Sequence, residues 1–348
     1  MQKEVLIGMS GGIDSAIAAY LLKKQGYDVT GVFLDLFPSA HDGMEEVLKI
    51  AHILNIPVSR YNGHKLFKQY VITPFLQEHL NGRTPSPCIF CNKQVKWKAL
   101  NDVADTFGIK KIATGHYVEF PTIDNKVRIK KAKDESKDQS YFLWSIPQEI
   151  LQRAITPLHP YTKKEVKRIA NELGLDFLLR KKESSGICFS EGCSTDTLLI
   201  KLLREANISV APGNVINDKN EVIGQHNGYL FYTIGQKKNL KLNSNEKLCV
   251  SEILPKTNEL KVNTWQNLYT KNITATATYL QDINELEDAR NLYVKVRGFG
   301  INPNAGCKII IDVEKMHIEL DDPAWAVAPG QPVVVYKNNL VVAAGLIL

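Results

Sequence analysis

The chain has 348 residues, of which 44% are hydrophobic and 23% charged. This length fits about two domains, and the composition excludes a disordered or fibrous chain. No apolar run approaches the roughly eighteen residues of a membrane-spanning helix, and no basic stretch followed by an apolar one marks a secretory signal. We therefore expect a cytoplasmic protein with no membrane association, whose six cysteines are thiols, metal ligands or catalytic groups.

Strand and helix patterns alternate over the first 115 residues. Short apolar runs predict strands at 4–9, 28–34, 57–58 and 111–114, and helical spacing predicts helices at 13–25, 44–54, 66–80 and 92–107. This alternation is typical of an α/β fold with a parallel, doubly wound sheet. Ligands of such sheets bind beyond the carboxyl ends of the strands.

The pattern changes after about residue 195. A helix is predicted at 195–205, and short alternating runs between turn signals follow it. Further strands are predicted at 274–279, 292–296, 307–313, 317–320, 332–336 and 341–347. We expect a first domain over 1–195, a small central domain over 196–270 and a C-terminal β-barrel over 271–348.

Charge is distributed unevenly along the chain. The net charge is +6, and the segment 121–182 alone holds fourteen Lys or Arg against eight Asp or Glu. A local excess of this kind suits a polyanion such as nucleic acid, although an uneven solvated surface has the same composition.

The string Ser10-Gly11-Gly12-Ile13-Asp14-Ser15 follows the first predicted strand and opens the first helix. Adjacent glycines let successive backbone N–H groups point at one anion, and the helix N-terminus adds partial positive charge. The hydroxyls of Ser10 and Ser15 can donate to the same anion, and Asp14 can hold Mg²⁺ or cap the turn. No G-x-x-x-x-G-K-[ST] string is present, which excludes a Walker-type loop.

This string resembles the PP-loop of the ATP pyrophosphatases. The resemblance implies that ATP is cut between its α- and β-phosphates and that a substrate oxygen is adenylated. It makes 1–195 a PP-loop, ATP-binding catalytic domain.

Two segments carry cysteines that suit sulfur chemistry. Cys88 and Cys91 stand directly before the helix predicted at 92–107, and Cys188 follows a basic cluster at 180–182, so both surroundings favour thiolates. Persulfide sulfur transfer is one interpretation. A zinc site of Cys88, Cys91, Cys188 and Cys193 is a second, and an iron–sulfur cluster on Cys88, Cys91 and Cys188 is a third. Cys249 and Cys307 lie in strand-like runs and are expected to be buried thiols.

Taken together, these strings resemble the tRNA-specific 2-thiouridylase family along most of the chain. The matching motifs are Gly8–Ser15, Gly82–Cys88, Cys91–Lys93, Ala113–Tyr117, Lys137–Leu143, Ser185–Phe189, Tyr232–Gln236 and Pro329–Gln331. The set is far more specific than any one motif.

The resemblance implies a role for each matching residue. It makes Cys91 the nucleophile and Cys188 the persulfide carrier. It assigns ATP binding to Gly8, Met9, Ser10, Gly11, Gly12, Ile13, Asp14, Ser15, Leu34 and Gly115. It assigns tRNA contacts to His116, Lys137, Asp138, Gln139, Ser140, Lys295, Arg297 and Gln331, with the β-barrel contributing.

The implied reaction is ATP- and Mg²⁺-dependent 2-thiolation of the wobble uridine in tRNA. The C2 oxygen is adenylated, and a cysteine persulfide supplies sulfur as AMP and pyrophosphate are released. The implied partners are the tRNAs for Lys, Glu and Gln, and a persulfide sulfur carrier or a cysteine desulfurase.

One departure from the family pattern bears on the chemistry. Many members carry Asp where Cys88 stands, and a thiol is a poorer general acid than a carboxylic acid at neutral pH. This substitution leaves Cys88 either in the acid/base position or as a ligand of a [4Fe–4S] cluster. Three rival functions are a PP-loop thiolase acting on another base, an RNA-binding module with a degenerate nucleotide site, and a zinc-stabilised ATP-binding protein.

Overall fold

The computed structural model describes residues 3–38, 42–180, 186–242, 247–287, 291–298, 302–303 and 306–348. The chain forms two compact units, each made of several segments. The first comprises Met1–Val71, Cys88–Phe189 and Asn339–Val341, and the second comprises Ile72–Pro87, Ser190–Asn338 and Val342–Leu348. Among the described residues, no helix combines the length and apolar character needed to cross a membrane.

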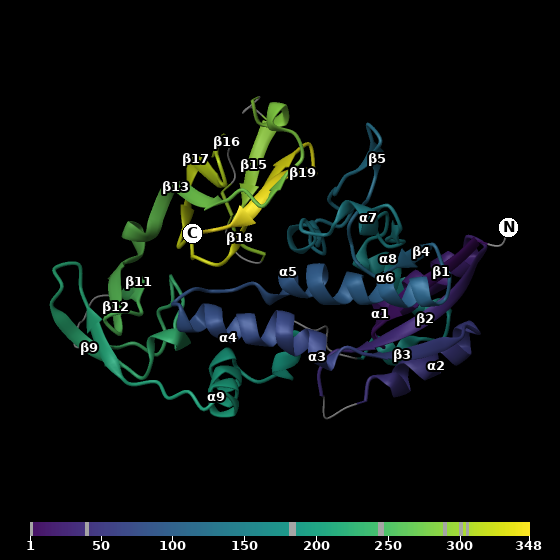
Figure 1. The fold of residues 1–348 in the computed structure, drawn as a ribbon, viewed down its shortest axis with the longest axis horizontal. Helices are drawn as coiled ribbons and strands as arrows, with labels where there is room; N and C mark the ends of the chain where they lie inside the picture. Colours follow the sequence, from purple (N-terminus) through teal and green to yellow (C-terminus); the bar gives the residue numbers. More distant parts are fainter. Residues whose placement is uncertain are drawn as a thin grey trace. The chain divides into compact units, whose positions relative to one another are not determined.

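A five-stranded parallel sheet organises the first unit (Figure 1). Its strand order is β3-β2-β1-β4-β7, and every pairing between neighbours is parallel. The central strand β1 is buried on both faces, because Val5, Leu6 and Ile7 expose no surface. The strands are β1 (Lys3–Met9), β2 (Tyr27–Asp35), β3 (Val58–Asn62), β4 (Lys111–Ala113) and β7 (Ala154–Ile155). The predicted parallel sheet is confirmed.

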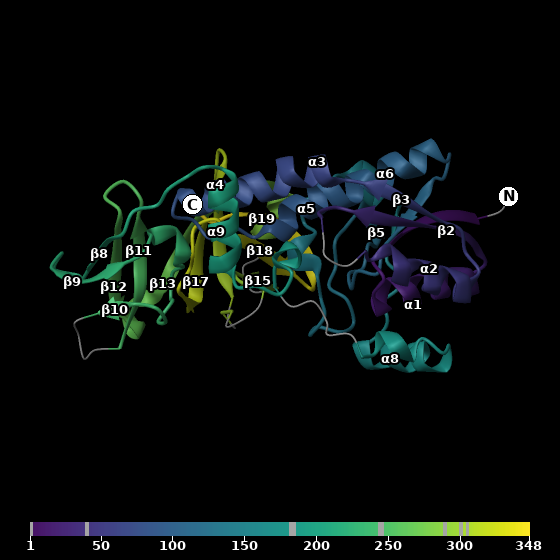
Figure 2. The ribbon, with the colours of Figure 1, turned by 90° about the horizontal axis from the view of Figure 1, so that it is seen from below.

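Helices cover both faces of this sheet (Figure 2). Helices α1 (Ile13–Lys24) and α2 (Met44–Leu54) lie on one face, and α6 (Trp97–Thr106) lies on the other. Helix α8 (Lys163–Glu172) packs against α1 and begins with a capping box between Thr162 and Glu165. The doubly wound arrangement is therefore confirmed.

Strand order reverses between β1 and β4, which are neighbours in the sheet but far apart in the chain. The loops that leave the carboxyl ends of these two strands carry Ser10–Gly12 and Thr114–His116. A reversal of this kind opens a crevice at that edge of the sheet. The topology therefore places the two motifs beside the expected binding crevice.

Two helical runs contain a π-helical turn. The first runs through α3 (His64–Phe67), η1 (Lys68–Ile72) and α4 (Thr73–Leu80), and the second through α5 (Pro87–Cys91), η2 (Asn92–Lys96) and α6. The prediction that the second helix begins after Cys91 is wrong. It begins at Pro87, whose fixed φ and missing N–H suit a first helical turn.

The remaining elements of the first unit are short. They are β5 (Thr122–Ile123), β6 (Lys126–Val127), η3 (Ser140–Phe142), α7 (Gln148–Leu151), η4 (Asp176–Leu178) and η5 (Cys188–Ser190).

The second unit begins its main segment with the predicted helix α9 (Thr195–Glu205), which Ser194 caps. A sheet of order β10-β9-β8-β12-β11 follows. Its elements are β8 (Gly213–Ile216), β9 (Val222–His226), η6 (Tyr229–Phe231), β10 (Lys241–Leu242), β11 (Leu248–Leu254), β12 (Glu259–Thr264) and η7 (Trp265–Leu268).

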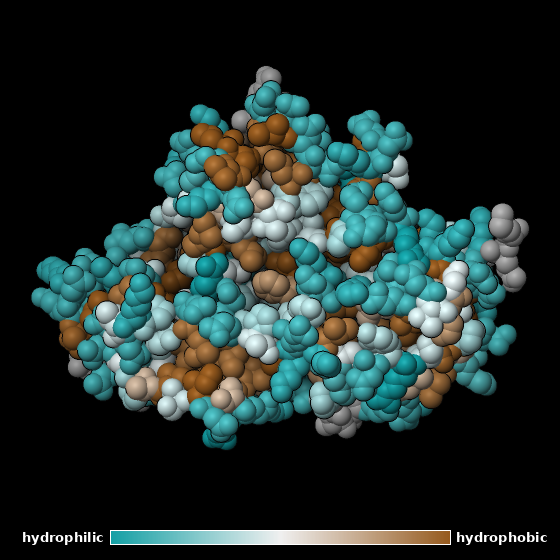
Figure 3. All heavy atoms as spheres, viewed as in Figure 1, coloured by the Kyte–Doolittle hydropathy of each residue, from teal (hydrophilic) through white to brown (hydrophobic). Residues whose placement is uncertain are grey.

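Two antiparallel sheets then form the C-terminal barrel, with orders β13-β17-β16 and β14-β19-β18-β15. Cys249 and Cys307 are buried thiols in these β-rich parts, as predicted. On the face shown in Figure 3, hydrophobic atoms gather over the barrel, where Ile310 is 55% exposed. The elements are β13 (Tyr269–Thr276), β14 (Tyr279–Leu280), η8 (Ile283–Leu286), β15 (Leu292–Lys295), β16 (Cys307–Asp312), β17 (Lys315–Trp325), β18 (Pro332–Lys337) and β19 (Leu340–Leu346).

Candidate active site

The loop between β1 and α1 has the geometry of an anion nest. Gly11 adopts a φ of +72°, and Gly12 is the extended N-cap residue of α1. The backbone N–H of Ser10 donates to Ser15 Oγ at 3.2 Å, and Ser15 Oγ donates to the Gly12 carbonyl at 3.0 Å. The serine hydroxyls therefore hold the loop in shape before any anion arrives.

Gly115 allows the loop after β4 to approach this nest closely. A Cβ atom at this position would lie 2.7 Å from the backbone carbon of Asp14 and 2.7 Å from the nitrogen of Ser15. Since real side chains do not approach backbone this closely, only glycine fits here without moving the nest. Sequence reasoning selected Gly115 from the family resemblance, and the structure supplies the steric reason.

The carboxylate of Asp14 is held by two side chains from distant parts of the chain. Lys163 Nζ donates to both carboxylate oxygens at 2.7 and 2.8 Å, and the Tyr117 hydroxyl donates to Oδ1 at 2.8 Å. Lys163 is buried, so this cation stays next to the nest. We expected Asp14 to hold Mg²⁺ or to cap the turn. Instead its charge is already balanced by Lys163, a residue that sequence reasoning missed.

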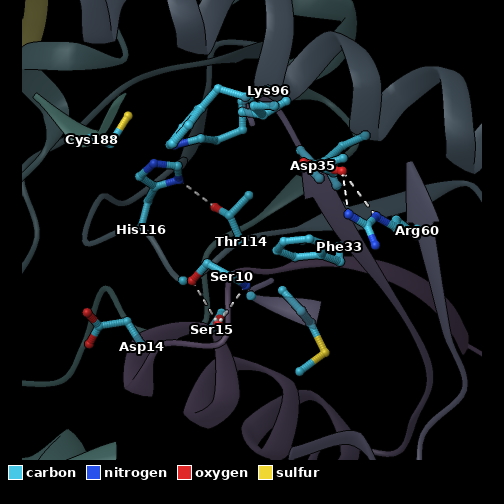
Figure 4. Close-up of a pocket in the computed structure, with 18 of the residues that line it drawn as sticks. Ser10, Asp14, Ser15, Phe33, Asp35, Arg60, Lys96, Thr114, His116 and Cys188 are labelled. Atoms are coloured by element: carbon cyan, nitrogen blue, oxygen red, sulfur yellow. Dashed lines mark hydrogen bonds and ion pairs between the residues drawn. The ribbon is translucent and has the colours of Figure 1, made fainter. Parts of the chain in front are cut away.

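A cavity of about 670 Å³ lies at the carboxyl edge of the sheet (Figure 4). Asp35, at the end of β2, closes one side of it and accepts hydrogen bonds from Arg60 at 2.6 Å and from His64 at 2.8 Å. The predicted site residues that line it are Gly8, Met9, Ser10, Asp14, Ser15, Leu34, Gly115, His116, Gln139 and Cys188. Residues of the predicted nucleotide motif and one of the candidate cysteines therefore share a single cavity.

The other two cysteines sit on the helix beside this cavity. Cys88 and Cys91 belong to α5, with Cys91 only 8% exposed, whereas Cys188 opens η5 and is exposed. Cys88 and Cys91 are near enough to Cys188 for a negative charge on Cys188 to raise both of their pKa values. The three thiols thus lie within range of one another's charge, and sulfur transfer between Cys188 and Cys91 stays a prediction.

The predicted thiolate character of these cysteines is wrong for this structure. Burial is the largest effect on each thiol and raises its pKa, to about 12 for Cys91. The helix begins at Pro87, so Cys91 lies one turn inside rather than directly before the N-terminus. Protein atoms also crowd Cys188, but because its side chain reaches solvent we expect a smaller rise there.

Among the described residues, the cation that acts on these thiols is not Arg180 of the predicted cluster. Arg180 in the basic cluster pairs with Asp176 at 3.9 Å, and the rest of that cluster, 181–182, lies outside the described residues. Instead, Lys96 on η2 lowers the pKa of all three thiols, in opposition to burial. Sequence reasoning missed Lys96, because its effect depends on the π-helical turn.

No group of three or more His, Cys, Asp or Glu side chains in the described ranges comes together as a metal site. The four-cysteine zinc interpretation therefore finds no support, and Cys193 is simply an exposed thiol. The same observation gives no support to a cluster on Cys88, Cys91 and Cys188.

His116 lies inside the cavity wall rather than at the surface. Its Nδ1 is 2.8 Å from the Thr114 hydroxyl, and its ring stacks on Trp97 with centroids 5.9 Å apart. Burial, aided by the charge of Lys96, lowers its pKa well below the usual range. His116 is therefore a neutral imidazole, suited to hydrogen bonding rather than to ion pairing.

The segment 137–140 folds around a buried carboxylate. Asp138 accepts hydrogen bonds from the Ser140 hydroxyl at 2.7 Å and from the backbone N–H of Ala132 at 3.2 Å. Gln139 lines the cavity and accepts from the Tyr117 N–H at 2.9 Å. Asp138 and Ser140 thus shape the segment from within, and their contact with tRNA stays a prediction, as does that of Lys137.

The other residues assigned to tRNA contacts belong to the second unit. Lys295 ends β15, and Arg297 donates to the Ala326 carbonyl and lies 5.5 Å from the Trp325 ring. Gln331 donates to the Thr84 carbonyl at 2.8 Å. Gln331 therefore has a structural partner within its own unit, and no observation tests whether it also meets RNA.

Comparison with known proteins settles the family. Residues 3–192 match the family described as the tRNA methyl transferase HUP domain, 202–264 match its PRC-barrel domain, and 265–347 match an aminomethyltransferase beta-barrel domain. The chain is 35% identical over 350 residues to tRNA-specific 2-thiouridylase MnmA 2 of Phocaeicola vulgatus, covering 99% of this chain and 98% of that protein. The chain belongs to the MnmA family.

Two further relatives agree. MnmA 1 of Bacteroides fragilis is 37% identical over 363 residues, covering 99% of this chain and 97% of its own length. MnmA of Clostridium acetobutylicum is 33% identical over 359 residues, with full coverage of both proteins. The predicted architecture of an α/β domain followed by two β-rich parts is confirmed by the sheets and by the matched domains.

Proposed function

We propose that this protein is an ATP-dependent tRNA 2-thiouridylase, with cytoplasmic tRNAs for Lys, Glu and Gln as substrates. The observation that carries the proposal is the shared cavity, in which the Ser10–Ser15 nest and the Cys188 thiol face the same space. Membership in the MnmA family supports the same reaction. We further propose that the chain works as a catalytic domain over 1–195, a central domain over 196–270 and a barrel over 271–348 that helps to bind tRNA.

The nest end of the cavity is proposed to bind ATP. Backbone N–H groups of the loop and the N-terminus of α1 favour phosphate oxygens, and Lys163 cancels the charge of Asp14 that would repel them. Leu34 and Gly115 would lie against the adenosine. Mg²⁺ enters with ATP as part of the substrate and shields its phosphate charge.

The tRNA is proposed to present its wobble uridine to the same cavity. The C2 oxygen is unreachable in a base stack, so the nucleotide must be flipped out. Neutral His116 and Gln139, both on the cavity wall, are placed to hydrogen-bond the flipped base. The positive surplus over 121–182 suits the phosphates of the anticodon stem.

The chemistry then proceeds in balanced steps. The uridine O2 attacks the α-phosphate of ATP, and pyrophosphate leaves. The persulfide anion on Cys188 attacks C2, the C2–O bond breaks, and AMP leaves with the electron pair. The Cys91 thiolate attacks the Cys188 sulfur, and the broken S–S bond leaves its electron pair on the transferred sulfur as 2-thiouridine. A dithiol reductant opens the resulting disulfide, and a persulfide donor reloads Cys188.

The proposal is tested by nucleoside mass spectrometry of unmodified tRNA incubated without oxygen with the protein, ATP–Mg²⁺ and a persulfide donor. We expect 2-thiouridine that depends on ATP, with one AMP formed per thiouridine. A 2-thiocytidine product would identify a thiolase of another base. Bound tRNA without AMP or a thionucleoside would contradict the proposal.

A further inference from the structure

Lys96 occupies a special place on the cavity wall. It is the last residue of the π-helical turn η2, which separates the helix α5, with Cys88 and Cys91, from α6. Its half-buried side chain lines the cavity together with His116 and Cys188. Figure 4 shows this side chain arching over the cavity toward His116, on the side where Cys188 lies. Single π-helical turns inside α-helices often mark functional sites.

The charge of Lys96 is uncompensated, unlike that of the neighbouring cations. Arg60 pairs with Asp35 at 2.6 Å and with Asp42 at 3.0 Å, and Lys163 pairs with Asp14 at 2.7 Å. For Lys96, the described parts of the chain provide no carboxylate within ion-pair distance. A cation in a cavity that lacks a protein counter-charge is available to an anion formed there.

The groups that face Lys96 come from three elements. They are Cys88 and Cys91 on α5, Cys188 on η5 and His116 after β4. Its charge favours the anionic form of each sulfur and the neutral form of the imidazole. Among the described residues, Lys96 is the one cation that lowers the pKa values of these three thiols. Burial raises each of these pKa values and so opposes its effect.

We propose that Lys96 is the counter-ion of sulfur transfer, a positioning residue that stabilises the persulfide anion on Cys188 and the thiolate on Cys91. This inference rests on the proposed function, because both proposed attacks begin from a sulfur anion. Adenylation of the uridine begins from a neutral oxygen near the nest and needs no charge at Lys96. Removing the charge must therefore slow sulfur transfer and spare adenylation.

The main test compares Lys96→Met with Lys96→Arg and with the control Lys98→Met. Lys98 stands two residues along the same helical run, is exposed, and pairs with Asp102 at 2.9 Å. Iodoacetamide labelling of Cys188 in the free enzyme, followed by peptide mass spectrometry from pH 7 to 10, reports the thiol directly. Single-turnover formation of 2-thiouridine and of pyrophosphate on persulfide-loaded enzyme reports the two halves of the reaction, because pyrophosphate leaves at adenylation whereas AMP leaves only when sulfur attacks.

For Lys96→Met we expect the labelling profile of Cys188 to move upward by about one pH unit, because one lost charge nearby is worth roughly a tenfold change in thiolate fraction. At pH 7.5 we expect 2-thiouridine formation to fall on the order of 100-fold, since two sulfur anions lose the same partner. Pyrophosphate formation should stay within about threefold of the wild type. Lys96→Arg should restore both readouts, and Lys98→Met should leave both unchanged.

Three results would overturn the inference. One is an unchanged labelling profile in Lys96→Met, whether or not turnover falls. Another is a loss of pyrophosphate formation as large as the loss of 2-thiouridine, which would assign Lys96 to the nucleotide phosphates. The third is failure of Lys96→Arg to restore turnover in a variant whose circular dichroism matches the wild type. If the wild type makes no 2-thiouridine, the proposed function fails. The iodoacetamide labelling of Cys188 would still show whether Lys96 acts on that thiol.

Discussion

The nest end and the sulfur end of the cavity balance their charges in opposite ways. At the nest end, Asp14 is paired with Lys163 at 2.7 Å and hydrogen-bonded to Tyr117, and the serine hydroxyls close the loop on itself. At the sulfur end, Cys91 is buried with its pKa raised to about 12, and Lys96 has no carboxylate partner among the described residues. One end has its charges paired before substrate binds, whereas the other holds a cation that has no anionic partner among the described residues.

The difference reflects what each end must do. A phosphate site gains from fixed backbone donors that need no rearrangement when ATP binds. A sulfur-transfer site must keep its second thiol from reacting until the uridine carries the sulfur, and the buried, protonated thiol of Cys91 achieves that. Three substitutions, in order of decreasing effect, and a pH titration separate the two ends.

Replacing Cys188 by Ser should give the largest effect. We expect 2-thiouridine formation to fall by on the order of 1,000-fold or more, because the hydroxyl carries no transferable sulfur. The single-turnover release of pyrophosphate on tRNA should remain within about threefold, because the nest is untouched. Nucleoside mass spectrometry and pyrophosphate release measure the two halves.

Cys193→Ser is the matched control, because Cys193 is an exposed thiol five residues further on. It should keep full activity. A comparable loss in Cys193→Ser, or residual thiolation in Cys188→Ser supported by persulfide alone, would refute the assignment of sulfur transfer to Cys188.

At the nest end, Gly115→Ala should weaken nucleotide binding by about 100-fold, since a displacement near 1 Å in a binding site has effects of that size. The new methyl group would meet the backbone of Asp14 and Ser15 at 2.7 Å and must push the loop away. Titration calorimetry with ATP measures the loss of binding affinity. Labelling of Cys188 should stay as in the wild type.

Gly108→Ala controls for general destabilisation. Gly108 has a φ of +70°, so alanine is strained there, but its Cβ would meet nothing within 4 Å. We expect a lower melting temperature with unchanged ATP affinity. Equal loss of affinity in both variants would show that Gly115 acts through stability rather than through the nest.

Lys163→Met should raise the KM for ATP by about tenfold, because the freed Asp14 carboxylate then repels the phosphates. Lys163 is buried beside Asp14, whereas its neighbour Lys164 is exposed on the same helix. Lys164→Met should therefore leave the KM unchanged. Steady-state pyrophosphate release gives both values, and an unaltered KM in Lys163→Met would remove the charge-balancing role.

The sequence predicted the nest end better than the sulfur end for physical reasons. The Ser10–Ser15 string is local, and the alternation of strands and helices is enough to place it beside the loop that carries Gly115. Lys163 lies 149 residues from Asp14, and its only local signal was the capping box of Thr162 and Glu165, which marks the start of α8.

The sulfur end depends on features that a sequence does not reveal. In a regular α-helix, residues five apart such as Cys91 and Lys96 lie about 140° apart around the axis. The π-helical turn η2 closes five residues and brings Lys96 over the cysteines, as the hydrogen bond that the Lys96 backbone N–H donates to the Cys91 thiol shows. Burial of Cys91, which reverses the predicted direction of its pKa shift, is likewise a tertiary property.

The pH dependence of the two ends should also differ. A thiol reacts as its thiolate, and burial raises the pKa of both Cys91 and Cys188, so exposed Cys188 should react faster as pH rises, whereas the buried position of Cys91 shields it from the reagent. Between pH 7 and 9 we expect iodoacetamide labelling of exposed Cys188 to accelerate by about tenfold per pH unit, while Cys91 stays unlabelled in the folded protein. ATP affinity should change by less than about twofold over this range, because the nest binds through backbone N–H groups.

Unfolded protein, in which both thiols react at similar rates, is the control. If the labelling rate of Cys188 were already independent of pH below pH 8, Cys188 would be a preformed thiolate. The predicted difference in pH dependence between the nest end and the sulfur end would then be absent.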